Sequence, residues 1–366
     1  MILIISEGVA KQPRKSVDGR LALIDLLRFV AAMIVVSFHF SFRGPKGDFM
    51  SALQLPPALV YTSQYGYLGV SLFFMISGFV IAYSAEGRTA TAFGISRFTR
   101  LYPSFLVCMT ITFVVLTFFP VAVFPISMKQ YLANLLLYSK FLHQPMMDGV
   151  YWSIYYEAIF YGWVFFLLLF GVFQKWQHSI VLVWLIVSIL NFVVLQSEFL
   201  KLIFVTDYAY FFIIGILVYR MRGGDFSFLT LGLLASSSCF ALYTAYVEAG
   251  LLIVSFATPY STLTAMAFLL SAMVVFIMAA LYKGSVPMQQ YFIFLGALTY
   301  PLYLSHQMIG YAFIGVFYGK VPDQILLLMT VAFVLGLAFL VNRYFEKPFL
   351  PRIRKLLTHL LERPSA

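Results

Sequence analysis

Residues 23–40 read LIDLLRFVAAMIVVSFHF, an apolar stretch interrupted by Asp25, Arg28 and His39. A helix rises about 1.5 Å per residue, so about 20 apolar residues cross the hydrocarbon core of a bilayer. Ionisable side chains inside a span are costly, and they usually face a protein interior or a water-filled space. The stretch therefore predicts a membrane-spanning helix that carries part of a functional site.

The rest of the chain has the same character. Of 366 residues, 62% are hydrophobic and 10% are charged, and the mean hydropathy is +0.93. This composition excludes a large soluble domain and predicts an all-α, polytopic membrane helix bundle with about ten transmembrane helices. We expect spans near residues 21–42, 66–85, 102–124, 150–171, 179–196, 204–220, 227–247, 258–282, 290–317 and 325–345. Residues 128–143 are too short and too polar to cross, which favours an interfacial or re-entrant helix.

The basic residues indicate the topology. Of the 24 lysines and arginines, seventeen fall in segments expected to be cytoplasmic and six in outer segments, while Arg28 lies within the first span. By the positive-inside rule, both termini are expected in the cytoplasm. This gives a cytoplasmic tail over residues 1–20, a transmembrane domain over 21–345 and a basic cytoplasmic tail over 346–366. The basic charge then follows from topology and contact with membrane lipid, and no nucleic acid partner is expected.

Arg28 and His39 share one face of the first span. They are 11 residues apart, which corresponds to about 16.5 Å along a helix and roughly 20° around it. Two alternatives remain for these residues taken singly. Arg28 could extend its charge to the inner interface beside Asp25, and His39 could make an ordinary hydrogen bond between helices.

Two further spans carry polar groups at a similar depth. Residues 149–160, GVYWSIYYEAIF, place Glu157 roughly 10 Å below the outer surface, with Ser153 one turn above it. Residues 294–307, FLGALTYPLYLSHQ, place His306 about 24 Å from the inner end. The aromatic residues near Trp152 could equally form an interfacial belt. Convergence of two imidazoles and a carboxylate from three helices nevertheless favours a site in the outer leaflet.

Basic clusters mark the inner face. Residues 96–103, SRFTRLYP, carry Arg97 and Arg100, and residues 343–355 read RYFEKPFLPRIRK. These clusters could bind phosphate groups, or they could be topology charges in contact with anionic lipid. The two cysteines, Cys108 and Cys239, lie in apolar runs, so neither a disulfide nor a metal site is expected.

Taken in order, these segments resemble the membrane-bound acyltransferase family 3 over roughly residues 20–350. The matching motifs are Arg28 with His39; Gly69, Val70, Phe73, Phe74, Ser77, Gly78 and Phe79 in the second span; Arg97, Arg100, Tyr102 and Pro103; Trp152, Ser153 and Glu157; Gly296 to His306, which includes Tyr303; and Tyr344, Glu346 and Pro348. Ser96 stands where a further basic residue is usual in this family.

The resemblance implies an integral-membrane O-acyltransferase of a bacterial inner membrane. It would move an acetyl or other short acyl group from cytoplasmic acyl-CoA to a hydroxyl of a sugar or glycan, for example in a lipopolysaccharide or another polysaccharide. Acetyl-CoA would be a co-substrate, and no permanently bound cofactor is expected. The acceptor, the acyl-chain length and the oligomeric state stay open.

The resemblance also suggests roles for the site residues. Arg28, Arg97 and Arg100 would hold the CoA phosphates, and His39 would act as general base or as acyl carrier. Glu157 would orient or charge-balance a histidine, and His306 would stabilise an oxyanion. Ser77, Trp152, Ser153 and Tyr303 would complete the substrate site.

A different class of protein remains possible from the sequence. A transporter of a lipid-linked sugar or a small anion would also carry charge within the membrane, and Pro301 in mid-span would suit it. No inverted repeat supports this alternative. A structural partner with an inactive site is disfavoured because both His39 and Glu157 are present.

Overall fold

The computed structural model describes residues 21–47, 53–121, 124, 126–137, 139–256, 258 and 260–362. Within these ranges the chain is helical and contains no strand, which confirms the all-α prediction. The α-helices are α1 (Ala22–Phe38), α2 (Gly44–Lys46), α3 (Pro57–Ser63), α4 (Gly69–Ala85), α5 (Ala90–Phe118), α6 (Met128–Asn134), α7 (Tyr151–Leu169), α8 (Gln177–Leu190), α9 (Glu198–Phe204), α10 (Ala209–Arg222), α11 (Phe228–Phe256), α12 (Thr262–Leu281), α13 (Gln289–Phe317), α14 (Asp323–Val341) and α15 (Lys347–Leu361). Three π-helical turns extend them, namely η2 (His39–Arg43), η5 (Asn191–Leu195) and η6 (Asn342–Glu346); the 3₁₀ segments are η3 (Gly66–Leu68) and η4 (Ser139–Leu142).

Nine of the ten expected spans coincide with helical segments in the described residues that are long and apolar enough to cross a membrane. The remaining one, expected near residues 290–317, is α13, which has 29 residues. This helix is long enough to cross, but polar residues such as Thr299, Ser305 and Gln307 interrupt its apolar sequence. Most of its middle is buried against other helices, where polar side chains find partners.

Three segments differ from their predicted form. Helix α5 begins at Ala90 rather than near residue 102, so Arg97 and Arg100 lie inside the helix. Residues 128–143 form the short α6 and then η4, rather than one helix. The predicted C-terminal tail contains α15, a 15-residue amphipathic helix. The predicted tail over residues 1–20 lies outside the described residues.

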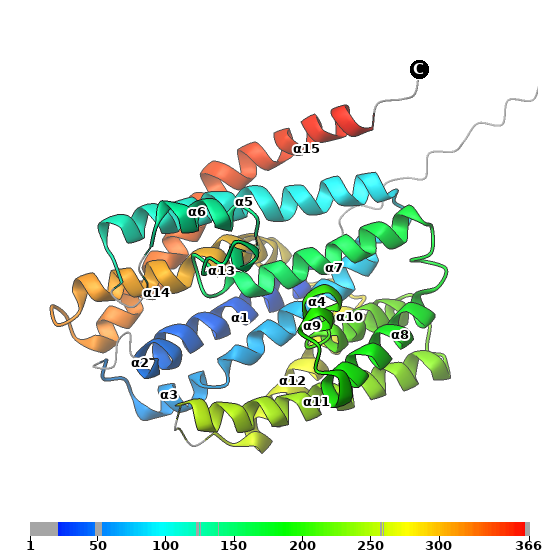
Figure 1. Ribbon diagram of the computed structural model, residues 1–366, viewed down its shortest axis with the longest axis horizontal. Helices are drawn as coiled ribbons and strands as arrows, with labels where there is room; N and C mark the ends of the chain where they lie inside the picture. Colours follow the sequence, from blue (N-terminus) through cyan, green and yellow to red (C-terminus); the bar gives the residue numbers. More distant parts are fainter. Residues whose placement is uncertain are drawn as a thin grey trace, which may run out of the picture.

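Glycines allow two close helix pairs at the centre of the bundle (Figure 1). A Cβ at Gly78 would lie 2.1 Å from the Phe212 carbonyl oxygen, and one at Gly215 would lie 2.1 Å from the Met75 carbonyl oxygen, so α4 and α10 pack backbone to backbone. A Cβ at Gly296 would lie 2.5 Å from the Asp25 Cβ, which brings α13 against α1. These pairs set the positions of the helices that carry the polar residues.

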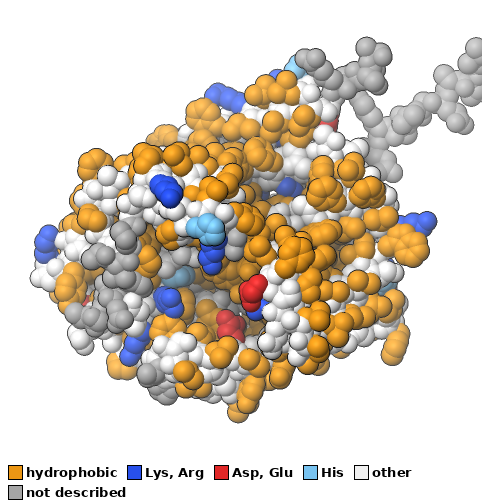
Figure 2. Space-filling view, viewed as in Figure 1, with side chains coloured by type: hydrophobic (Ala, Val, Ile, Leu, Met, Phe, Trp, Pro, Cys, Tyr) orange, Lys and Arg blue, Asp and Glu red, His pale blue; other side chains and the backbone are white. Residues whose placement is uncertain are grey.

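Hydrophobic side chains dominate the face of the molecule in Figure 2, with few charged groups among them. Large exposed apolar residues occur on several helices, including Phe166, Val183 and Val254 at 54%, 60% and 82% exposure. Such exposure would be unfavourable in water over so large an area, and it suits contact with lipid. The protein is a multi-pass membrane helix bundle.

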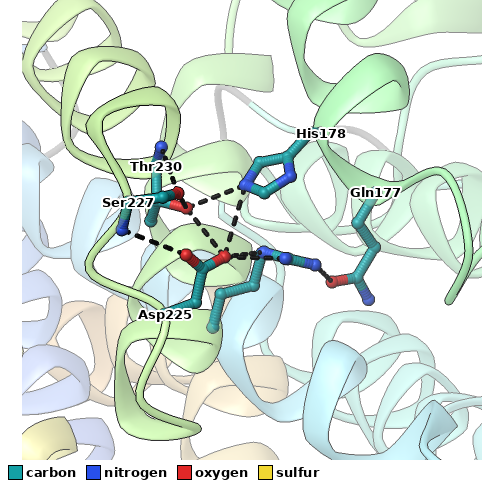
Figure 3. A network of polar contacts seen from close by, with 6 residues as sticks. Gln177, His178, Asp225, Ser227 and Thr230 are labelled. Atoms are coloured by element: carbon teal, nitrogen blue, oxygen red, sulfur yellow. Dashed lines mark hydrogen bonds and ion pairs between the residues drawn. The ribbon is translucent and has the colours of Figure 1, made fainter.

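A polar network joins three helices at one end of the bundle (Figure 3). The Asp225 carboxylate lies 2.7 Å from Arg220 Nη2 and accepts hydrogen bonds from Thr230 Oγ1 and the Ser227 backbone N–H. His178 Nε2 lies 2.7 Å from Thr230 Oγ1. Partial burial by itself raises the pKa of Asp225, but hydrogen bonds from Ser227, Arg220 and Thr230 together hold it below its ordinary value. This network ties α8, α10 and the start of α11 together.

Candidate active site

Two imidazoles meet between α1 and α13. His39 begins the π-helical turn η2, and His306 lies in α13, five residues after Pro301. His306 Nε2 is 3.1 Å from His39 Nδ1, and the ring centroids are 4.9 Å apart. His306 is fully buried, whereas His39 is partly exposed. Turns of π-helix within α-helices are rare and frequently occur at functional sites.

The partners of the two rings determine which nitrogens carry hydrogen. His306 Nδ1 is 2.9 Å from the Tyr303 carbonyl oxygen, and His39 Nδ1 is 2.9 Å from the Val35 carbonyl oxygen. A carbonyl oxygen only accepts, so in neutral imidazoles both Nδ1 atoms carry the hydrogen. His306 Nε2 is then an acceptor for His39 Nδ1–H. It follows that His39 Nε2 has a free lone pair, and among the described residues no hydrogen-bond donor occupies it.

The loop before α7 braces α13 next to His306. Asp148 is 1% exposed, and its carboxylate accepts hydrogen bonds from the backbone N–H groups of Val150, at 3.1 Å, and Met308, at 3.1 Å. Burial raises the pKa of Asp148 to about 7, against the opposing effect of these two hydrogen bonds. The sequence analysis missed this residue. Its only signal is a carboxylate in the otherwise uncharged loop segment QPMMDGVY, residues 144–151.

Pro301 frees a backbone carbonyl, as its position predicts. The Ala297 carbonyl oxygen, which has lost its usual partner four residues later, accepts a hydrogen bond from Asn342 Nδ2 at 3.3 Å. Asn342 Nδ2 also donates to the buried Glu346 carboxylate, which in turn accepts from Ser104 Oγ at 2.8 Å. The end of α14 is therefore joined by side chains to both α13 and α5.

Tyr303 and Ser153 lie beside the imidazole pair. Their hydroxyl oxygens are 2.7 Å apart, and the Tyr303 ring centroid is 5.8 Å from that of His306. Phe73 packs against Tyr303 at 5.4 Å. Trp152 points elsewhere, because its ring lies 5.1 Å from that of Tyr208 in an aromatic cluster. Of the neighbouring residues Trp152 and Ser153, Ser153 therefore lies at the site and Trp152 packs beside it.

Glu157 lies on α7, one turn further along the helix than Ser153. Its Oε1 accepts hydrogen bonds from Ser77 Oγ at 2.9 Å and from Tyr161 Oη at 2.5 Å. Both partners are hydroxyl groups, and neither is an imidazole. The contact between Glu157 and a histidine that the sequence suggested is therefore absent from the hydrogen bonds of the described residues.

A cavity of about 1290 Å³ is lined by Ser77, Ser153, Glu157 and Tyr303. Six cationic side chains and three carboxylates line it, namely Arg28, Arg88, Arg97, Arg100, Arg354 and Lys355 with Glu157, Glu346 and Glu362. Neither imidazole is among its lining residues. The excess of cationic side chains suits an anionic ligand, and Tyr303 on the cavity wall lies beside His306, with ring centroids 5.8 Å apart.

The cavity arginines are held by aromatic rings. Arg97 lies 5.8 Å above the Tyr161 ring, and Arg100 lies 5.6 Å above the Tyr300 ring. Arg28 is 3.7 Å from Asp25, which is the pair that the sequence suggested. The Nε of Arg97 is buried and has no hydrogen-bond partner among the described atoms. This N–H group is available to donate to an anionic ligand, since Arg97 lines the cavity.

The structure brings nine of the ten predicted site residues to one connected region. His39 and His306 form the imidazole pair, and the cavity wall holds Arg28, Arg97, Arg100, Glu157, Ser77, Ser153 and Tyr303. Trp152 alone is outside both groups. The cavity is also lined by Arg354 and Lys355, from the C-terminal cluster for which phosphate binding was left open, and by Arg88, which was interpreted only as a topology charge.

Comparisons with known proteins agree with this arrangement. A family model described as an acyltransferase domain, acyltransferase family 3, matches residues 21–343. The chain is also 35% identical over 98 residues to acyltransferase MdmB of Streptomyces mycarofaciens, a match that covers 26% of this chain and 24% of that protein. No solved structure matches the chain. The family match extends over most of the chain, including both imidazoles, Glu157 and the three predicted arginines, and the chain belongs to acyltransferase family 3.

Proposed function

We propose that this membrane acyltransferase transfers an acetyl or other short acyl group from acyl-CoA to a hydroxyl of a sugar or glycan. The observation that carries the proposal is the cavity of about 1290 Å³ that links the basic groups of α5 and α15 to Ser153 and Tyr303. CoA has the matching shape and charge, with phosphates at one end and a thioester at the end of a long, flexible arm. Arginine suits the phosphates because its planar group binds two oxygens at once.

The free lone pair of His39 Nε2 supplies the general base. As the acceptor oxygen attacks the thioester carbonyl, Nε2 takes the hydroxyl proton, and the new carbon–oxygen bond forms. The carbon–sulfur bond then breaks, and the departing thiolate takes the proton from the imidazolium. General-base catalysis of this kind contributes on the order of 10²–10⁴ to the rate.

His306 orients the base in this scheme. Its Nε2 accepts from His39 Nδ1–H and thereby fixes the tautomer and orientation of His39, as the carboxylate does for the histidine of a Ser-His-Asp triad. Tyr303 and Ser153 carry hydroxyl groups that can donate to the developing oxyanion beside the cavity end. Glu157, which shares the cavity wall with Arg28, offsets the charge of the arginines once CoA has dissociated.

The two substrates approach from opposite ends of the bundle. We place the basic mouth of the cavity in the cytoplasm, where acyl-CoA is made. His39 is partly exposed without lining that cavity, so the acceptor reaches it from the outer side. This arrangement keeps the thioester away from bulk water until the acceptor is present. We assign the protein to the bacterial inner membrane.

The test uses purified full-length protein with acetyl-labelled acetyl-CoA. We expect slow release of free CoA thiol, and faster release when extracts that contain the acceptor glycan are added. Mass spectrometry of surface glycans from cells with and without the gene then identifies the acceptor by loss of an acetyl group. Intact acetyl-CoA or intact sugar moved across proteoliposomes, without thiol release, would instead show a transporter.

A further inference from the structure

Helix α15 has two chemically different faces. Arg354, Lys355, Thr358, His359 and Glu362 line the cavity, and their spacing of four residues places them on one face of the helix. The opposite face carries Phe349, Ile353, Leu356 and Leu360. Three of these, Phe349, Leu356 and Leu360, are 45%, 57% and 52% exposed. An amphipathic helix of this kind lies at a membrane interface, with its apolar side toward lipid.

The helix is held against α5 at a defined place. In Figure 1, α15 runs along the edge of the bundle beside α5 rather than within it. Its first turn follows Glu346, whose carboxylate accepts from Ser104 Oγ of α5 at 2.8 Å. The cavity is bounded on one side by Arg97 and Arg100 of α5 and on the other by Arg354 and Lys355 of α15. Helix α15 is therefore a wall of the cavity mouth.

We propose that Arg354 and Lys355 bind the 3′-phosphate at the adenosine end of the CoA donor. This inference rests on the proposed function and adds a second phosphate-binding group to it. If the thioester lies beside Tyr303, the order of groups along CoA places the diphosphate near Arg97 and Arg100 and the 3′-phosphate farthest out. Among the cations that line the cavity, Arg88, Arg354 and Lys355 are exposed whereas Arg97 and Arg100 are half-buried, so the cations of α15 and Arg88 lie nearest the solvent.

An anionic lipid headgroup offers the same phosphate chemistry, but the placement of charges favours CoA. A cation that serves lipid binding on an interfacial helix projects at the border of the apolar face, toward the headgroups. Arg352 has that position, since it lies 5.7 Å above the Phe349 ring and does not line the cavity. Arg354 lies about 200° around the helix from Arg352, and both Arg354 and Lys355 line the cavity. Arg352 is therefore a matched control on the same helix.

The experiment measures binding of CoA and of 3′-dephospho-CoA to full-length protein in nanodiscs of neutral lipid, by isothermal titration calorimetry. For R354A/K355A we expect about tenfold weaker binding of CoA, because charge-assisted hydrogen bonds are lost at a site that is partly screened by water. R352A should bind CoA within about twofold of wild type. Removing the 3′-phosphate should weaken wild type and R352A but leave R354A/K355A unchanged.

The outcomes separate this inference from the proposed function. Absence of CoA binding by wild type would overturn both. Wild-type binding with an equal response of R354A/K355A to removal of the 3′-phosphate would overturn the inference alone. If R354A/K355A bound CoA more weakly than wild type only in nanodiscs with anionic lipid, Arg354 and Lys355 would be assigned to lipid headgroups. That result too would overturn the inference. Thermal unfolding midpoints of the variants should match wild type, because both side chains are exposed.

Discussion

The molecule contains two histidine clusters with opposite properties. Around His178, the polar groups are paired with one another. His178 contacts Thr230, and the Asp225 carboxylate has Arg220, Thr230 and the Ser227 backbone N–H as partners. Around His39, the network ends on a free lone pair, and a cavity with an unpartnered Arg97 Nε lies behind the neighbouring Tyr303. Open space beside unused donors and acceptors distinguishes a reactive site from a structural one.

The largest expected effect follows from removing the base. H39A should lower kcat at least 100-fold, because the proton acceptor is lost. Its unfolding midpoint should remain near that of wild type, since His39 is partly exposed. Thiol release from acetyl-CoA and a thermal melt measure the two quantities.

The matched variant for that experiment is H178A in the closed network. It should lower the unfolding midpoint and leave activity per folded molecule unchanged, because His178 contacts Thr230 and lies outside the cavity. A large loss of turnover in H178A, with His39 intact, would erase the distinction between the two clusters.

The next effect concerns the donor site. R97A/R100A should raise the KM for acetyl-CoA by about 10–100-fold with little change in kcat, because charge-assisted contacts to phosphate are lost and the inner end is partly solvated. R343A is a suitable control, since Arg343 is exposed and does not line the cavity. A fall in kcat at unchanged KM would place these arginines in the chemical step instead.

Loss of the orienting imidazole of His306 should have an effect of comparable size to R97A/R100A, but on kcat rather than on KM. H306A should lower kcat by about 10–100-fold, a smaller loss than H39A, because the Val35 carbonyl still holds His39 Nδ1–H. The KM for acetyl-CoA should not change, since His306 does not line the cavity. The pH dependence of kcat is the sharper readout. A wild-type pH profile in H306A would remove the orienting role.

The smallest effect concerns the closed network and its pH dependence. The folded-state pKa of Asp225 is lowered by its hydrogen bonds, despite the opposing effect of burial. The stability it contributes is therefore present above the unfolded-state value of about 3.9 and is lost as pH falls below it. D225N should cost on the order of 1 kcal/mol of stability near neutral pH. The difference from wild type should shrink in acid, as followed by unfolding at several pH values.

Much of the fold could be predicted because the bilayer imposes a length and an apolar composition on each span. Arg28, His39 and His306 could also be assigned depths, since a helix has a fixed rise per residue. The spans were located to within a few residues in most cases. Helices α5 and α11 are the exceptions: α11 extends nine residues beyond the predicted end, to Phe256, and the first turns of α5 carry Arg97 and Arg100 and therefore have the hydropathy of a loop.

Long-range contacts could not be predicted in the same way. Spacing placed Glu157 at a similar depth to the histidines, but side-chain packing gave it Ser77 and Tyr161 as partners. Asp148 and the Met308 backbone N–H, which are 160 residues apart in the chain, are joined only by tertiary packing. The cavity face of α15 depends on how that helix docks on α5, which a single sequence does not specify.

The central claim is that a donor bound in the cavity reacts at His39, and one measurement tests it directly. Acetyl-CoA binding and thiol release are measured together on wild type and H39A in the same nanodiscs. The account predicts equal binding by the two proteins, with thiol release reduced at least 100-fold in H39A. Thiol release by H39A at the wild-type rate, with equal binding, would show that the chemistry takes place elsewhere and would contradict the account.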